Sequence, residues 1–259
     1  MRTIAIALLL LAPFASAEIV AKDFDYKDHL DAAVTLQGFL AYDDAVKDKR
    51  PGVLIVHQWK GLGEQEKNTA KRLAKLGYVA FCVDIYGKGI RATDAKVARE
   101  QATKYRKDLK LFRHRMIIAM AELVKTGKVA DGKIAAIGYC FGGGGVLELA
   151  RSGAPVAGVV SFHGNLNTPD PKDAEKIKGK VLVCHGADDP IVPDEQVVAF
   201  MNEMRAAKVD WQLIAYGGAV HSFTDPTANR AGMAQYNEKA AKRSWKAMRD
   251  FFDEIFADE

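Results

Sequence analysis

Residues 133–145, KIAAIGYCFGGGG, place a short apolar run directly before a cysteine and a row of glycines. Lys133–Tyr139 is typical of a buried strand, and the residues after Cys140 have helical spacing. A sharp strand-to-helix turn strains the backbone of the residue at its apex. Only residues without side chains avoid collision two positions before and after it, where this chain has Gly138 and Gly142. The stretch therefore predicts a nucleophile elbow with cysteine in the place where serine is more usual.

Two other interpretations of this turn start from the same residues. The glycines could simply hold a buried structural cysteine, or they could cradle a phosphate. Neither GxGxxG nor GxxxxGK[ST] is present, which argues against the phosphate loop. Ser161 is the nearest alternative nucleophile, but Val159 and His163 flank it where small residues are required. The helix after Cys140 would point its free amides at the sulfur and favour the thiolate.

The rest of the chain alternates short β-branched runs with longer segments of helical spacing. The middle runs are apolar almost throughout, as in strands buried on both faces of a parallel sheet. Repeated strand–helix–strand units predict an α/β fold with helices on both faces, and the first run is expected to be an antiparallel edge strand. The predicted strands are Thr35–Tyr42, Gly52–His57, Val79–Ile85, Lys133–Tyr139, Val156–Phe162, Lys180–Cys184 and Trp211–Tyr216. The predicted helices are Gln65–Leu76, two within Asp94–Lys125, Gly143–Ala150, Asp194–Ala207 and Asn237–Phe256.

Composition limits the class of protein. Of 259 residues, 49% are hydrophobic and 27% charged, which are values of a globular protein. The formal net charge of +4 is spread along the chain without a basic stripe, so nucleic acid is not expected as a partner. The chain length fits one generous domain, and no lid domain is expected.

The first 17 residues have the pattern of a secretory signal peptide. Arg2 precedes an apolar run from Ile4 to Phe14, and Ala15-Ser16-Ala17 forms a small-x-small exit. The run is shorter than the ~20 residues that span a bilayer, so no membrane anchor is expected. We expect residues 1–17 to be removed, leaving 18–259 as a single periplasmic or secreted domain.

An elbow also predicts the order of its partners along the chain: nucleophile, acid, then histidine. His221 is the only histidine after the strand Trp211–Tyr216. Asp188 and Asp189 both follow the strand Lys180–Cys184, and the order alone leaves either as the acid. Among the other histidines, His29 and His114 are expected at the surface, while His57, His163 and His185 are candidates for lining the pocket.

Several motifs resemble one family. These are Gly138–Gly143 (GYCFGG), Gly186–Pro193 (GADDPIVP), His221–Phe223 (HSF), Pro51–Leu54 (PGVL), Val56–Leu62 (VHQWKGL) and Asp84–Lys88 (DIYGK). Together they resemble the dienelactone hydrolase family of the α/β-hydrolase fold. The resemblance implies a mostly parallel central sheet, helices on both faces and no cap domain. It also implies hydrolysis of enol lactones and other small esters through a Cys–His–Asp triad, without a metal or cofactor.

The resemblance assigns roles to particular residues. It implies Cys140 as nucleophile, His221 as base and Asp189, rather than Asp188, as the acid. It also implies that the backbone amides of Phe141 and Trp59 form the oxyanion hole, in which two donors stabilise the developing charge.

The substrate pocket departs from the family pattern. Many members have a glutamate that contacts the thiol where this chain has Gln58, so the activation of the thiol is left open. Tyr86 is expected in the same pocket. Two arginines grip the substrate carboxylate in the family, where this chain has Lys88 and Asp225. Because Asp225 inverts the charge, we expect neutral esters to be preferred, unless Asp225 faces solvent before Pro226 or Arg230 replaces the missing cation.

Two other functions compete with dienelactone hydrolysis. One is a broad carboxylesterase or acetyl esterase with no dienelactone activity. The other is a non-hydrolytic periplasmic thiol protein that reuses the fold. In the family's strand order Cys82 and Cys184 lie about four strand spacings apart, or ~19 Å, well beyond the ~7 Å limit for a disulfide. A small ester or lactone is the expected partner, and a monomer is the expected state.

Overall fold

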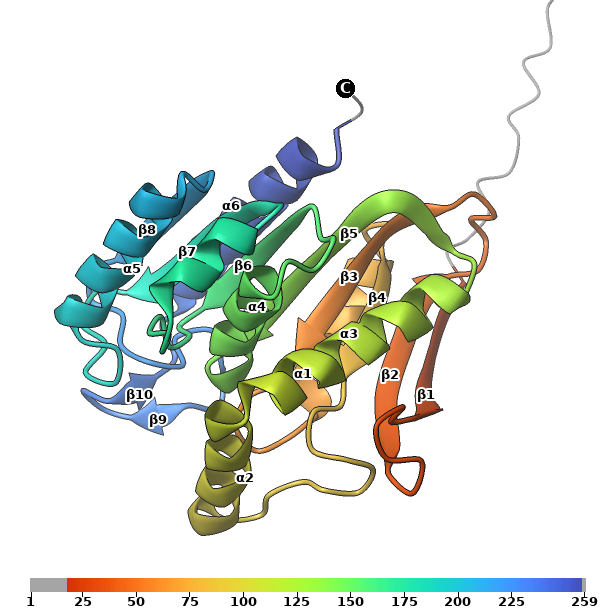
Figure 1. Cartoon of the computed structure of the whole chain (residues 1–259), viewed down its shortest axis with the longest axis horizontal. Helices are drawn as coiled ribbons and strands as arrows, with labels where there is room; N and C mark the ends of the chain where they lie inside the picture. Colours follow the sequence, from red (N-terminus) through yellow and green to blue (C-terminus); the bar gives the residue numbers. More distant parts are fainter. Residues whose placement is uncertain (1–17, 258–259) are drawn as a thin grey trace, which may run out of the picture.

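The computed structural model describes residues 18–257, and the predicted signal peptide, residues 1–17, lies outside the described residues. Eight strands form one sheet in the order β1-β2-β4-β3-β5-β6-β7-β8 (Figure 1). The strands of this sheet are β1 (Ile19–Lys27), β2 (Thr35–Asp43), β3 (Arg50–Val56), β4 (Val79–Val83), β5 (Val129–Tyr139), β6 (Gly158–Phe162), β7 (Lys180–Gly186) and β8 (Trp211–Tyr216). The helices are α1 (Glu64–Ala74), α2 (Ala95–Lys107), α3 (Leu109–Lys125), α4 (Phe141–Arg151), α5 (Asp194–Ala207) and α6 (Glu238–Ile255).

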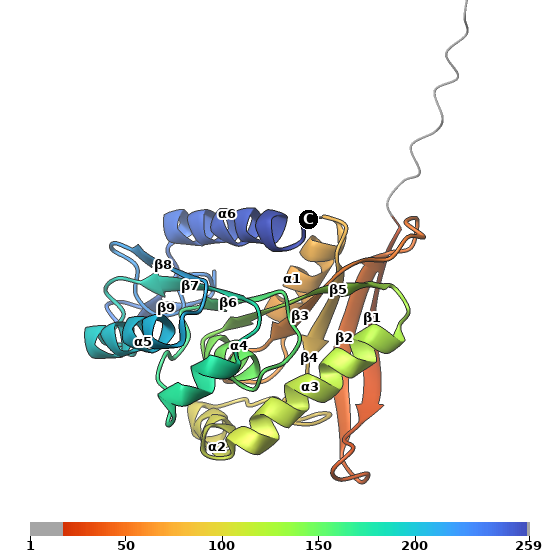
Figure 2. The ribbon, with the colours of Figure 1, turned by 45° about the horizontal axis from the view of Figure 1, so that its top comes forward.

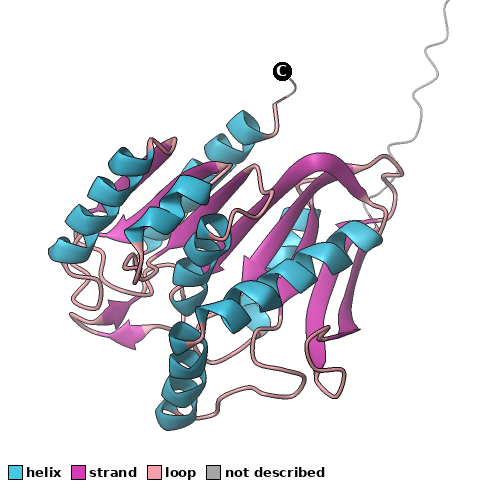
Figure 3. Ribbon diagram, in the orientation of Figure 1, coloured by secondary structure: helices cyan, strands magenta, loops and turns pink. Residues whose placement is uncertain are grey.

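Helices cover both faces of the sheet, as the sequence predicts. Figure 2 shows α1 and α6 on one face and α2 to α5 on the other, and Figure 3 distinguishes the strands of the sheet from these helices by colour. The six strands from β4 to β8 along the sheet order run parallel. Right-handed strand–helix–strand connections place successive helices on these faces.

Each central strand feeds two separate cores because its residues alternate between faces. Leu54 and Val56 of β3 pack with α3 and α4, whereas Val53 and Ile55 pack with α1 and α6. All four are fully buried. A strand with two buried faces must be apolar at every position, which explains the unbroken GVLIV run.

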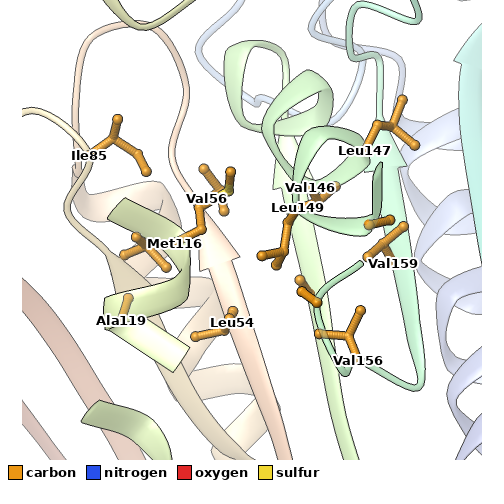
Figure 4. Close-up of a cluster of buried hydrophobic side chains, with 14 of the residues drawn as sticks. Leu54, Val56, Ile85, Met116, Ala119, Val146, Leu147, Leu149, Val156 and Val159 are labelled. Carbon is orange, nitrogen blue, oxygen red and sulfur yellow. The ribbon is translucent and has the colours of Figure 1, made fainter. Parts of the chain in front are cut away.

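The core under α3 and α4 lies directly behind the site. Figure 4 shows Met116 and Ala119 of α3 facing Leu54 and Val56 of β3, with Val146 of α4 beside them. This packing fixes the two helices against the strands whose ends carry the functional residues.

One prediction about the sheet is wrong. The strand that starts at Thr35 was expected at the edge, but β1 pairs with it along its whole length, Ile19 opposite Asp43 and Lys27 opposite Thr35. β1 therefore forms the edge. Only the second half of its sequence, IVAKDFDYK, alternates polar and apolar residues, and most of its side chains remain exposed or half-buried. Its exposed face made it less conspicuous than the apolar central strands.

The division of the segment 94–125 into two helices is confirmed. Asp108 leaves helical geometry at φ −111° and ψ 77°, and its carboxylate accepts a hydrogen bond from Leu111 N at 2.9 Å to cap α3. The charged stretch 164–180 contains a short 3₁₀ helix, Pro171–Lys176. Within residues 18–257, no helix is both long and apolar enough to cross a membrane.

A small hairpin after β8 is a feature that the sequence did not predict. It consists of β9 (Asn229–Arg230) and β10 (Ala234–Gln235). Gln235 N donates a hydrogen bond to His221 O at 3.0 Å, so the hairpin is attached to the histidine loop. Strands of two residues carry no periodicity that a sequence can reveal.

Candidate active site

The turn at Cys140 has the strained geometry that the glycine spacing predicts. Cys140 adopts φ 53° and ψ −110° and directly precedes α4. A Cβ at Gly138 would lie 2.0 Å from the carbonyl oxygen of Gly142, and a Cβ at Gly142 would lie 2.2 Å from that of Val56. Both glycines are therefore required for the close approach of strand, turn and helix. The positive end of α4 lies at the sulfur and favours negative charge there.

Three side chains from distant parts of the chain form a hydrogen-bonded row. His221 Nε2 lies 3.0 Å from Cys140 Sγ, and His221 Nδ1 lies 2.8 Å from Asp189 Oδ2. Cys140 follows β5, Asp189 follows β7 and His221 follows β8, so parallel strands bring all three to one edge of the sheet. All three are buried, with Cys140 retaining 8% exposure.

Asp189 is buried and held in a fixed orientation, whereas Asp188 is exposed. Asp189 Oδ1 accepts hydrogen bonds from Ile191 N at 2.8 Å and Val192 N at 3.3 Å, which leaves Oδ2 for His221. The structure thus brings Asp189, and not Asp188, to the histidine.

The surroundings of His221 favour its protonated form. Burial alone would lower the pKa of His221, but the hydrogen bonds to Asp189 and Cys140 outweigh it and raise that pKa to about 10. The contact between Nε2 and Sγ places His221 where it can accept the thiol proton of Cys140.

A loop after β3 borders the sulfur and is fastened at several points. Tyr86 Oη donates a hydrogen bond to Trp59 O at 2.9 Å, and Gly61 N donates one to Gln58 O at 3.1 Å. Within residues 18–257, neither Trp59 N nor Phe141 N donates a hydrogen bond to another group. Both amides are thus free to donate to a substrate oxygen.

An open cavity of about 600 Å³ contains the sulfur. Gln58, Trp59, Asp225 and Arg230 line it together with Cys140 and His221. Gln58 Nε2 donates hydrogen bonds to Gln65 Oε1 at 2.6 Å and to Asp225 Oδ2 at 3.3 Å. Asp225 therefore faces the cavity, although its other oxygen also accepts from Thr227 N at 2.8 Å in the turn.

Two residues expected in the substrate pocket lie outside the cavity lining. Lys88 is exposed and forms an ion pair with Asp25 of β1. Tyr86 is buried beneath the loop, where it contacts Trp59 O and packs against Phe141 with ring centroids 5.5 Å apart. The prediction of Lys88 as a pocket cation is not met, because its side chain turns toward β1. This edge strand was not predicted from the sequence.

The histidines that were candidates for lining the pocket are buried behind it instead. Burial lowers the pKa of His57 to about 4, and it lowers the pKa of His163 and His185 as well. His57 Nε2 accepts a hydrogen bond from Ile85 N, so Nδ1 carries the proton and donates to Gln58 O at 2.6 Å. His163 bonds Thr224 Oγ1 at 2.7 Å. These neutral rings therefore support the loops around the site.

The surface expectation for His114 needs correction. Its Nε2 lies 2.6 Å from Asp28 Oδ1, and its side chain is 18% exposed. His29 is exposed, as expected.

Sequence reasoning missed two features of the cavity wall. Arg99 and Arg106 of α2 line it from one face of the helix, seven residues apart. Glu66 of α1 also lines it and is almost fully buried. The helical spacing of the arginines was visible, but nothing in the sequence placed α2 over the site. Glu66 stands three residues after Gly63, a helix-start spacing that carries no catalytic meaning by itself.

No group of three or more His, Cys, Asp or Glu side chains within residues 18–257 is arranged to hold a metal ion. Cys82 and Cys184 are buried free thiols on β4 and β7, four positions apart in the sheet order. Burial raises the pKa of both thiols above their usual value.

Comparisons with known proteins show the family of this chain. A sequence model of the dienelactone hydrolase family matches residues 36–256. The structure of a dienelactone hydrolase-like promiscuous phosphotriesterase from metagenomic libraries is 42% identical, with a TM-score of 0.87, covering 93% of this chain and 100% of that one. Another structure, named m3DLH, is 41% identical with the same TM-score, covering 92% of this chain and 99% of that one. A Saccharolobus solfataricus protein with the provisional name carboxymethylenebutenolidase is 23% identical over 254 residues, covering 85% of this chain and 94% of that protein.

Proposed function

Because the chain belongs to the dienelactone hydrolase family and is an ester hydrolase, we propose that it cleaves small esters or lactones through a cysteine acyl-enzyme. The contact between His221 Nε2 and Cys140 Sγ, 3.0 Å long, carries this proposal. It joins a nucleophile to a base, and Asp189 holds that base from the other side.

In the proposed reaction, His221 takes the proton of Cys140 and the thiolate attacks the carbonyl carbon. The carbonyl oxygen becomes an oxyanion that accepts hydrogen bonds from the amides of Phe141 and Trp59, and such bonds strengthen as charge develops. Collapse breaks the C–O bond, and the leaving alkoxide takes the proton from His221. Water then attacks the thioester, His221 accepts a proton from it, and the acid leaves as the sulfur is released.

Asp189 supports these reaction steps in two ways. It holds His221 in the tautomer and orientation that proton transfer requires, and it stabilises the imidazolium while the proton is on the ring. The two amides that hold Asp189 Oδ1 keep the carboxylate from rotating away.

Beside Asp225 the proposed site favours a neutral group over the carboxylate of a dienelactone, and Arg99, Arg106 and Arg230 are the cations elsewhere in the lining. The cation of Lys88 is engaged with Asp25, and Asp225 places a carboxylate on the cavity wall. Hydrolysis of p-nitrophenyl acetate, compared between wild type and Cys140→Ala, tests the proposal. Turnover that persists in Cys140→Ala would overturn it.

Phosphotriester hydrolysis is a second candidate, favoured by the 42% identity to a structure described as a promiscuous phosphotriesterase. The thiolate could attack phosphorus in place of carbon, with the same amides at the phosphoryl oxygen. Turnover of paraoxon, measured beside turnover of p-nitrophenyl acetate, tests this second candidate. A stable phosphorylated Cys140 without turnover would mean that paraoxon is an inhibitor and not a substrate.

A purely redox role for Cys140 finds little support in the positions of the other thiols. Cys82 and Cys184 are buried, and each forms its hydrogen bond elsewhere, to Glu66 O and with Tyr216 Oη. A resolving thiol must approach the attacked sulfur directly.

We also propose export, based on the residues before Glu18. The expected mature protein begins at Glu18, and intact-mass measurement of protein from the periplasm or medium tests this. Exported protein that retains Met1 would contradict it.

A further inference from the structure

Glu66 is a buried carboxylate on the wall of the cavity that the proposed mechanism does not use. It is 2% exposed and stands in the first turn of α1. No lysine, arginine or histidine within residues 18–257 forms an ion pair with it, and its neighbour Lys67 pairs with Asp23 instead. A buried carboxylate without a cation is costly unless hydrogen bonds compensate for it.

The hydrogen bonds that compensate come from the loop next to the sulfur. Glu66 Oε1 accepts from Gln58 N at 3.3 Å, and Oε2 accepts from Gly63 N at 2.9 Å. Each carboxylate oxygen therefore holds one end of the segment 58–63. Trp59, whose amide is the proposed oxyanion donor, lies directly after the first of these contacts.

An ionised carboxylate serves both contacts best. It presents two oxygens as acceptors, whereas a carboxylic acid or an amide turns one of its two positions into a donor. A donor facing an N–H leaves both groups unsatisfied, and one end of the segment is released.

We infer that Glu66 is a positioning residue that holds the 58–63 segment in place and aims the amide of Trp59 at the oxyanion. This inference rests on the proposed function and adds one regulatory consequence: protonation of one buried side chain loosens the oxyanion hole without touching Cys140 or His221.

The surroundings of Glu66 place this protonation near neutral pH. Burial raises the pKa of Glu66 to about 7 against the lowering effect of the Gly63 and Gln58 amides, and the Asp225 carboxylate raises it further. Other titratable groups near it are Cys82 on β4, Tyr139 on β5, and Glu64 and Lys67 on α1. Burial keeps Cys82 and Tyr139 neutral at this pH by raising the pKa of each.

The kinetic test compares wild type with Glu66→Gln. Loss of one oxyanion-hole donor costs about 10²–10³-fold in kcat, so partial misplacement should cost about 10-fold or more at pH 8, with KM little changed. The wild-type kcat should fall as pH drops through about 7, and Glu66→Gln should lack this transition. The matched control is Glu195→Gln, which removes an exposed carboxylate from the first turn of α5 and should change neither quantity.

Alkylation of Cys140 by iodoacetamide separates positioning from general damage, because this reaction uses the thiolate but no oxyanion hole. We expect Glu66→Gln to be alkylated at the wild-type rate while its ester turnover falls. A parallel fall in both rates, or a Glu66→Gln variant with wild-type kcat and pH profile, would overturn the inference.

A direct measurement needs neither turnover nor a folded variant. In the wild-type protein, the amide proton shifts of Gln58 and Gly63 should titrate together with a midpoint near pH 7. The range from pH 5 to pH 9 covers about two units on each side of the transition. Chemical shifts that stay constant over this range would contradict the role of Glu66 in holding the 58–63 segment. If the wild type cleaves no ester, the proposed function fails, while this titration still decides the role of Glu66.

Discussion

Cys140 and His221 are 81 residues apart in the chain, yet the sulfur of one lies 3.0 Å from Nε2 of the other. Two conditions produce this contact. The strained turn at Cys140 lifts its side chain above the end of β5, and the loop after β8 returns His221 over the same edge of the sheet. The raised pKa of His221, about 10, reflects its bonds to both Cys140 and Asp189 despite burial.

Cys140 and His221 should act as one unit. Cys140→Ala or His221→Ala alone is expected to remove nearly all ester turnover, and the double variant should be little worse, because each residue is useless without the other. Steady-state hydrolysis of p-nitrophenyl acetate measures this. Losses that multiply in the double variant would mean that the two residues contribute independently.

Asp189 should matter far more than its neighbour. Asp189→Asn is expected to lower kcat about 10³–10⁴-fold, since the imidazole loses its orientation and the stabilisation of its charge. Asp188→Asn is the matched control, because Asp188 is exposed and one residue away. If Asp188→Asn were the damaging change, the assignment of the acid would be wrong.

The charge at Asp225 should select against anionic substrates. We expect Asp225→Asn to raise kcat/KM for a carboxylate-bearing ester about 10-fold relative to a matched neutral ester, since removal of a like charge about 8–16 Å away is worth about 1–2 kcal/mol at a surface-like dielectric. Lys88→Ala should leave this ratio unchanged, because Lys88 faces Asp25 and not the cavity. Arg99 and Arg106 of α2 also line the cavity, and a wild type that prefers the anionic ester would point to them.

A side chain should destabilise the protein at Gly142 of the elbow but not at Gly144. Gly142→Ala is expected to destabilise the protein by about 2–3 kcal/mol through overpacking, since its Cβ would lie 2.2 Å from Val56 O. In Gly144→Ala the new Cβ would lie 3.3 Å from its nearest neighbour, Asn165 O. This variant should change stability by less than about 1 kcal/mol. Urea unfolding measures both, and equal losses would show that the turn is not the strained element.

The sequence predicts the central part of the fold because its signals are local and strong. The run GVLIV and the elbow KIAAIGYCFGG each require one environment, a strand buried on two faces and a turn without side chains. The edge strand β1 was missed because half of its residues face water, so its apolar signal is diluted. The hairpin β9–β10 is too short to have a pattern.

The residues around the site also differ in whether local sequence signals could predict their positions. The order of Cys140, Asp189 and His221 along the chain could be read in advance because each follows a recognisable strand. The direction of the Lys88 side chain and the burial of Glu66 could not, because both depend on partners far away in sequence: Asp25 for the former and the 58–63 segment for the latter. A side chain's direction in a loop is set by tertiary contacts, which spacing does not encode.

In the proposed reaction the substrate's acyl group passes through the sulfur of Cys140. Rapid quenching of the enzyme with p-nitrophenyl acetate, followed by intact-mass and peptide analysis, tests it most directly. We expect one acetyl group per chain, attached to Cys140, to form in the burst phase, to accumulate in Asp189→Asn and to be absent in Cys140→Ala. An acetyl group on Ser161 or another residue, or sustained turnover by Cys140→Ala, would contradict a cysteine acyl-enzyme.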